Sequence, residues 1–139
     1  MATDDSLDIS LDEVLKQLRD VRLPLLRLHK ALLDSERLVY EQQYGTIASN
    51  MEFFRLVLEH EHFQWLRPMS QWIANFDDAL AAKHKPMTLA TAIAFQNSVK
   101  QLVQSSPLDP THGRKYYEAL ERDARVAKMH VEVSALLQG

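Results

Sequence analysis

The sequence contains no cysteine and only three glycines, at positions 45, 113 and 139. The lack of cysteine excludes a disulfide framework, a thiol nucleophile and a thiolate metal site, so a bound metal would need His, Asp or Glu ligands. Three scattered glycines cannot build a glycine-rich phosphate-binding loop. The sequence also lacks strand-like alternation of apolar and polar residues between turn pairs, and it therefore predicts an all-α protein.

The chain is also poor in clustered basic residues and in long apolar runs. Its 16 Lys and Arg residues are interleaved with 19 Asp and Glu residues, which leaves no basic stripe for the phosphates of a nucleic acid. The longest weakly polar run, residues 89–95, is much shorter than the roughly 20 residues of a membrane-spanning helix. The first ten residues, MATDDSLDIS, do not fit a secretory signal peptide, because they are acidic. We expect a cytoplasmic protein that binds neither nucleic acid nor membranes.

A chain of 139 residues, 46% of them hydrophobic, has the size and composition of one globular domain. Apolar residues recur every three or four positions along successive segments, as they do on the buried faces of amphipathic helices. We therefore predict a single antiparallel bundle of four to five helices across residues 10–139, preceded by a flexible acidic tail at residues 1–9. The clearest loop is residues 105–113, after which a last helix is expected from about residue 114 to residue 137.

Local motifs mark the ends of these helices. Ser10 and Ser49 each precede a glutamate by three residues, a capping-box pattern that predicts a helix start. Gly45 is expected to cap the end of the helix between them. Pro24 predicts a kink or a restart of its helix, and Pro68 predicts a kink or break near residues 60–68, because proline has no N–H group and its ring clashes with the carbonyl four residues earlier.

The stretch LVLEHEHFQWLRP contains candidate metal ligands. Glu59 and His62 form a Glu-x-x-His unit, which places a carboxylate and an imidazole on neighbouring turns of one helix face, as in ferritin-like di-iron bundles. Such a centre needs the unit twice, and the sequence holds it once. A metal site would therefore recruit His29 and Glu36 as facing ligands for iron, manganese or zinc. The alternative is that Glu59, His60, Glu61 and His62 lie at or near a helix break before Pro68, mostly exposed, and bind no cofactor.

His29 and Glu36 are polar residues on an apolar stripe. Leucines three and four positions away on both sides of His29 direct its ring toward the core, and Glu36 follows seven residues later on the same stripe. A buried polar group without a partner is costly, so both side chains should meet one. The structural interpretation is a buried polar network of His29, Glu36 and Arg67, in which His29 bonds to a carbonyl or hydroxyl and Glu36 pairs with Arg67. A catalytic carboxylate–imidazole site, and a ligand pocket in which Arg67 binds an anion, are alternatives.

The chain has many large aromatic residues for a bundle of short helices. Aromatic side chains are enriched at protein interfaces, and Trp65, Trp72 and Phe76 are therefore candidates for a contact surface. Their spacing also fits a helix face that packs into the core. Both interpretations stay open from the sequence.

Two segments carry a resemblance to other proteins. Residues 25–41, LLRLHKALLDSERLVYE, contain a Leu-His-Lys run followed by Asp-x-Glu, and residues 63–80, FQWLRPMSQWIANFDDAL, contain Trp-Leu-Arg-Pro. These patterns resemble a group of small bacterial all-helical proteins that have no assigned activity. The resemblance, with a weaker similarity at residues 117–130, implies a helical fold and a bacterial origin, and it implies no catalytic or binding role.

Taken together, the sequence favours a non-enzymatic helical module that binds a protein partner or itself, for example as a homodimer. A metal-binding bundle and a small-molecule pocket between helices are the alternatives. The remaining histidines stand in no recognised catalytic context.

Overall fold

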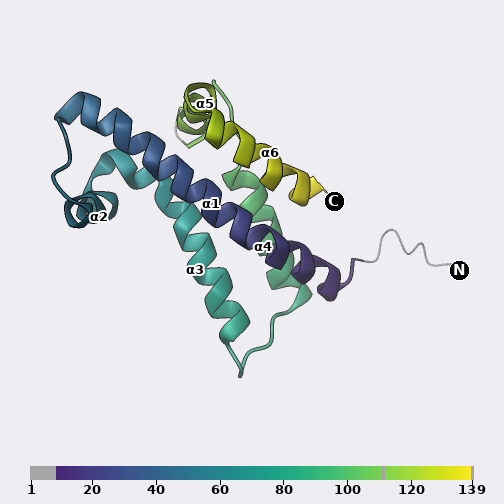
Figure 1. The fold of residues 1–139 in the computed structure, drawn as a ribbon. Helices are drawn as coiled ribbons and strands as arrows, with labels where there is room; N and C mark the ends of the chain where they lie inside the picture. The colour runs from purple at the N-terminus through teal and green to yellow at the C-terminus, as the bar shows by residue number, and fades with distance from the viewer. Residues whose placement is uncertain (1–8, 111, 139) are drawn as a thin grey trace, which may run out of the picture.

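The computed structural model describes residues 9–110 and 112–138, and within them all regular secondary structure is helical (Figure 1). The predicted all-α class is confirmed. The predicted count of four to five helices is wrong, because the described residues form six α-helices and one 3₁₀ helix. None of these helices combines the length and the hydropathy needed to cross a membrane. In chain order the elements are α1 (Leu11–Tyr44), α2 (Asn50–Glu59), the 3₁₀ helix η2 (Glu61–Leu66), α3 (Arg67–Ala81), α4 (Leu89–Leu102), α5 (His112–Arg122) and α6 (Ala124–Gln138).

The long helix α1 is the axis around which η2 and α3 to α6 pack. Helix α6 lies alongside α1 and runs in the opposite direction, whereas α3 and α4 diverge from it (Figure 1). The arrangement is therefore a central helix with shorter helices around it, and the expected simple antiparallel bundle is wrong. The acidic tail was predicted for residues 1–9, of which residues 1–8 lie outside the described residues.

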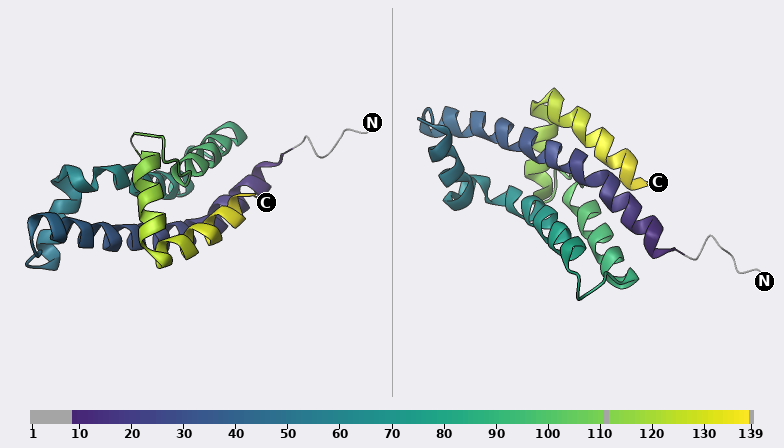
Figure 2. Two further views of the ribbon diagram at one scale, coloured as in Figure 1. Left: turned by 90° about the horizontal axis from the view of Figure 1, so that it is seen from above. Right: turned by 60° about the horizontal axis from the view of Figure 1, so that its bottom comes forward.

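Pro24 lies inside α1, and the helix continues through it. Figure 2 shows that the axis of α1 changes direction between its N-terminal part and the rest, so the proline bends the helix instead of ending it. Val21, Leu25 and Leu28 flank the proline and are each 0% exposed. Their burial on both sides offsets the roughly 3 kcal/mol that a proline costs inside a helix.

The second proline has a different role from the predicted kink. The break lies earlier, at His60, whose backbone is extended with φ −86° and ψ 135°. Pro68 sits in the first turn of α3, where its missing N–H group would have had no helical partner. It therefore starts a helix, and the break expected near residues 60–68 is found at His60.

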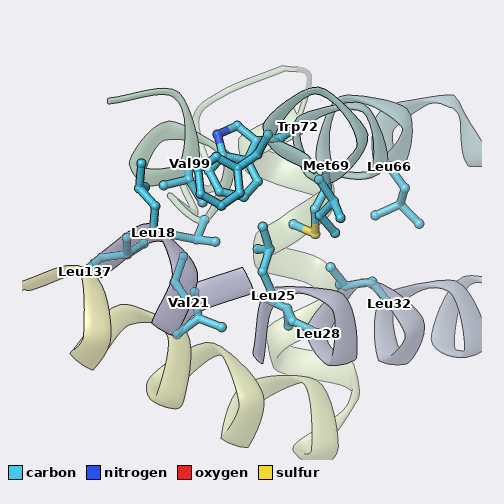
Figure 3. Packing of buried hydrophobic residues seen from close by; sticks show 14 of the residues in the cluster. Leu18, Val21, Leu25, Leu28, Leu32, Leu66, Met69, Trp72, Val99 and Leu137 are labelled. Atoms are coloured by element: carbon cyan, nitrogen blue, oxygen red, sulfur yellow. The ribbon is translucent and has the colours of Figure 1, made fainter. Parts of the chain in front are cut away.

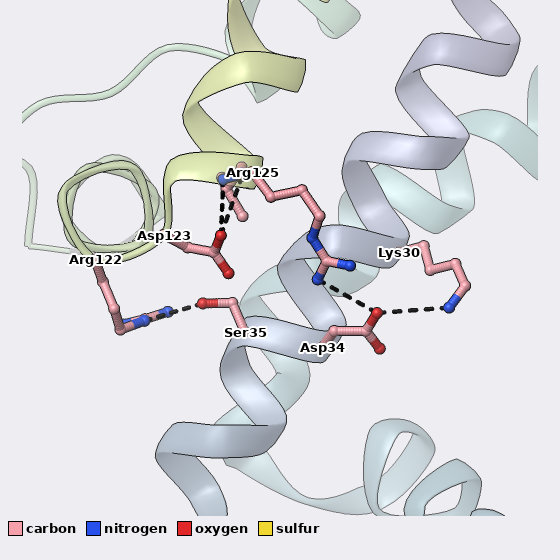
Figure 4. A network of polar contacts seen from close by, with 7 residues as sticks. Lys30, Asp34, Ser35, Arg122, Asp123 and Arg125 are labelled. Atoms are coloured by element: carbon pink, nitrogen blue, oxygen red, sulfur yellow. Dashed lines mark hydrogen bonds and ion pairs between the residues drawn. The ribbon is translucent and has the colours of Figure 1, made fainter.

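The predicted last helix, residues 114–137, is divided at Asp123. The Asp123 side chain accepts hydrogen bonds from the backbone N–H groups of Arg125 at 2.9 Å and Val126 at 3.4 Å (Figure 4). An aspartate that caps the first turn of the following helix in this way competes with continuation of the preceding one. The local side-chain bond thus separates α5 from α6.

The predicted caps are confirmed. Ser10 and Ser49 each accept a hydrogen bond of 3.1 Å from the backbone of the glutamate three residues later. Gly45 ends α1 with φ 101°, a conformation that residues with a Cβ atom rarely adopt. Its N–H group donates to the Glu41 carbonyl at 2.9 Å.

One hydrophobic cluster fills the space between α1 and the helices around it (Figure 3). Trp72 and Phe76 of α3 stack with ring centroids 5.1 Å apart, and Val99 of α4 is fully buried beside α1. At the surface, Arg22 of α1 donates two hydrogen bonds of 2.6 Å to the carboxylate of Asp77 in α3. The labelled core residues in Figure 3 are Leu18, Val21, Leu25, Leu28, Leu32, Leu66, Met69, Trp72, Val99 and Leu137.

Candidate functional site

The end of α1, helix α2 and the start of η2 form a projection that we call the arm, residues 37–63. In Figures 1 and 2 the arm lies at the C-terminal end of α1, far from the start of α1 and the end of α6. All ten residues of α2 are exposed or half-buried, although the helix carries several large apolar side chains. A helix with so little burial has an apolar face available to a partner.

The exposed face of α2 is an apolar stripe made of Met51, Phe54 and Leu58. Their exposed fractions are 77%, 65% and 52%, and their spacing of three and four residues places them on one side of the helix. Two further apolar side chains, Leu38 and Tyr44, are exposed by 62% and 54% at the end of α1. The arm therefore gathers five large exposed apolar residues within one projection.

The opposite face of α2 packs onto the rest of the arm. The Phe53 ring contacts Phe63 edge to face, with centroids 5.7 Å apart, and the Arg37 guanidinium lies 4.7 Å above the Phe53 centroid. Phe63 is 1% exposed and anchors this contact in η2. The apolar stripe is thus presented by a helix whose other side is already fixed to α1 and η2.

The base of the arm is a buried junction of charged groups around Glu36. Glu36 is 5% exposed, and its two carboxylate oxygens contact different partners. His62 Nε2 lies 2.8 Å from Oε2, and Arg122 Nη2 lies 3.1 Å from Oε1. Arg122 also donates to Ser35 Oγ at 3.0 Å (Figure 4). The junction therefore ties α1, η2 and α5 together.

A second, more exposed set of ion pairs lies beside the junction. Asp34 Oδ2 lies 3.5 Å from Lys30 Nζ and 3.4 Å from Arg125 Nη2 (Figure 4). The Asp34 side chain is 36% exposed and the Arg125 side chain 51%. Exposed pairs of this kind contribute little to stability, so removing one of their members should cost less than removing a partner of the buried Glu36.

The two histidines of the EHEH stretch position the arm. His60 Nδ1 accepts a hydrogen bond of 3.1 Å from the backbone N–H of His62, and this bond caps η2. The His60 ring also lies edge-on against Tyr40 and Tyr44 of α1, with centroids 5.2 and 5.3 Å apart. Tyr40 in turn contacts Phe63, with centroids 5.6 Å apart. The histidines therefore connect the arm to α1. The expected helix break is found here and Glu59 and Glu61 are exposed, whereas the two histidines are half-buried.

The polar network proposed from the sequence is only partly assembled. His29 is half-buried; burial lowers its pKa, an effect that a hydrogen bond to the backbone of Leu66 opposes. Arg67 is exposed and donates to the Leu58 carbonyl, so it holds the C-terminal end of α2. The expected Glu36–Arg67 pair is therefore wrong, because Arg122 occupies that position.

The four predicted metal ligands are not brought together. Glu36 and His62 are in contact, but Glu59 is exposed at the end of α2 and His29 bonds to the backbone near the start of α3. Within residues 9–110 and 112–138, no three His, Asp or Glu side chains are placed to share a metal ion. The contacts of Glu36 fit an ion-pair junction better than an iron, manganese or zinc site.

Two of the three interface candidates lie in the core. Trp72 is 5% exposed and Phe76 is 0% exposed, and Trp72 Nε1 donates to the Phe95 carbonyl at 3.0 Å. They are buried because α3 packs on α4 and α1 along this face. Trp65 is half-buried, with its ring edge-on to His112 at 5.3 Å. The α2 stripe, and not Trp72 or Phe76, therefore offers an exposed apolar surface for contact.

No family model, curated protein or solved structure matches this chain. The resemblance suggested by its sequence patterns stays a prediction.

Proposed function

We propose that the protein is a non-enzymatic helical module that binds a second copy of itself through the arm. The observation that supports this most directly is the exposed stripe of Met51, Phe54 and Leu58, three large apolar side chains on one face of a helix. A contiguous exposed apolar patch of this kind is often a binding surface. Because the Glu36 junction and the aromatic contacts already fix the arm, little conformational entropy is lost on binding.

The charges beside the stripe favour a second copy as the occupant. Glu52, Arg55 and Glu59 are exposed and alternate in sign along α2. A surface that carries both signs in alternation can complement itself, as the interface of a two-fold dimer requires. A partner of one charge sign would meet repulsion at one or other of these residues.

The size of the stripe sets the expected affinity. At the ~150–250 Å² that a large side chain can bury, the exposed parts of the three stripe residues amount to roughly 400 Å² per copy. A stable interface of standard size buries about 800 Å² per partner. The arm therefore supports a reversible dimer with a Kd on the order of micromolar to millimolar, tighter if Leu38 and Tyr44 join the contact.

Sedimentation velocity across a concentration series up to about 1 mM tests this proposal. We expect the mass of the wild-type protein to rise toward that of a dimer, and Phe54→Glu to remain monomeric because it buries a charge in the stripe. Val131→Glu is the matched control, since Val131 lies on α6 and is 66% exposed, close to the 65% of Phe54. The proposal fails if the wild-type protein stays monomeric, or if both variants reduce association equally.

A further inference from the structure

The charged residues of α2 occupy only one flank of its apolar stripe. At about 100° per residue, Arg55 and Glu52 lie roughly 70° and 130° to the same side of the mean direction of Met51, Phe54 and Leu58. Both charged side chains are exposed. When two copies of α2 pack through their stripes, the charged flanks meet in only one of the two relative orientations of the helices, parallel or antiparallel.

We propose that two copies pair with their α2 helices antiparallel, about a two-fold axis perpendicular to both helices. This inference rests on the proposed self-association and specifies its geometry. In an antiparallel pair of this symmetry, the charged flanks of the two helices lie on the same side of the contact. In a parallel pair they lie on opposite sides, and the charges of one copy cannot reach those of the other.

The stripe sets the register of the antiparallel pair. When Phe54 of one copy faces Phe54 of the second copy, Met51 of each copy packs against Leu58 of the other. In that register Arg55 of one copy lies within about one residue rise, roughly 2 Å along the axis, of Glu52 of the other. Symmetry repeats this ion pair, so each dimer holds two Arg55–Glu52 contacts.

These ion pairs lie at the rim of the contact and chiefly select its orientation. Exposed pairs each contribute little affinity, but the parallel arrangement lacks them altogether, so they favour the antiparallel orientation. The apolar stripe supplies most of the binding energy, because it is the part removed from water. Orientation and affinity thus depend on different residues, which makes them separable by experiment.

The cysteine-free chain allows the orientation to be read from engineered disulfides. Met51→Cys and Leu58→Cys are prepared as separate proteins, mixed, oxidised mildly and separated on a non-reducing gel. The antiparallel register places residue 51 of one copy beside residue 58 of the other, and it separates the two copies of residue 51 by roughly 10 Å along the axis. We expect the mixture to form a disulfide-linked dimer at least fivefold faster than either protein alone.

Each other outcome overturns the inference and identifies which step failed. Fast cross-linking of either single variant with itself indicates a parallel pair. An absence of any cross-link, while wild-type protein dimerises by sedimentation, indicates that two copies meet through another surface. Monomeric wild-type protein at all concentrations removes the proposed self-association itself.

Discussion

The buried junction at the base of the arm makes a quantitative prediction for Arg122. Arg122→Met keeps the length and apolar stem of the side chain and removes the guanidinium that contacts Glu36 at 3.1 Å and Ser35 at 3.0 Å. Glu36, which is 5% exposed, then keeps His62 as its remaining side-chain partner. The variant therefore leaves a buried carboxylate with half of its partners.

Removing one member of a buried ion pair costs about 3–5 kcal/mol. Two features of this junction reduce that value: the Arg122 side chain is 34% exposed, and His62 remains 2.8 Å from Glu36. We expect Arg122→Met to lower the free energy of unfolding by about 2 kcal/mol. For a domain of this size that corresponds to a decrease in Tm of roughly 6–8 °C.

Urea unfolding followed by circular dichroism measures this change, and a double-mutant cycle assigns it to the pair. In a Glu36→Gln background, Arg122→Met should cost at least 1 kcal/mol less than in the wild-type protein, because the buried charge is already gone. Arg125→Met is the control; its partner Asp34 is 36% exposed, and we expect a loss below about 0.5 kcal/mol. Equal losses for the two arginine variants, or an additive cycle, would refute the role of the junction.

Two further predictions concern the core and the arm. Because burial lowers the pKa of His29 from its ordinary value of 6.5, the unfolded chain binds more protons than the folded protein as the pH falls through that value. The free energy of unfolding should therefore decrease from about pH 7.5 to about pH 5.5, and His29→Gln should show a smaller decrease in urea titrations; an unchanged pH dependence would contradict this. In the arm, Arg55→Glu and Glu52→Arg should each weaken self-association, whereas an equimolar mixture of the two should restore it in sedimentation experiments. If the mixture associates no more tightly than either variant alone, these charges do not meet.

The sequence placed Glu36 on the buried stripe of α1 but could not identify its partners. A buried carboxylate needs a cation, and the chain offers 16 Lys and Arg residues at all distances from it. Arg67 was the expected partner because it precedes Pro68 in a distinctive motif. The helix break at His60 turns Arg67 toward the end of α2, while the turn at Asp123 brings Arg122 to Glu36. One weak signal pointed to Arg122, which follows the buried Ala119 by three residues.

For α2, the sequence identified the helix but not which of its faces stays exposed. The apolar periodicity of residues 50–59 identified an amphipathic helix, and the capping box at Ser49 located its start. Periodicity alone does not tell whether an apolar face meets the core or the solvent. Here α2 lies beyond the ends of α5 and α6, so its Phe53 side packs on the arm and its Phe54 side stays exposed.

Local chemistry in the sequence determined the helical class, both capped helix starts and the glycine that ends α1, because these depend on residues within a few positions of one another. The tertiary structure decided whether the prolines bent or started helices, which cation reached Glu36, and which apolar face remained in water. Each of these depends on segments far apart in the chain. Packing energies of several kcal/mol from such distant contacts outweigh the local preferences that a sequence displays.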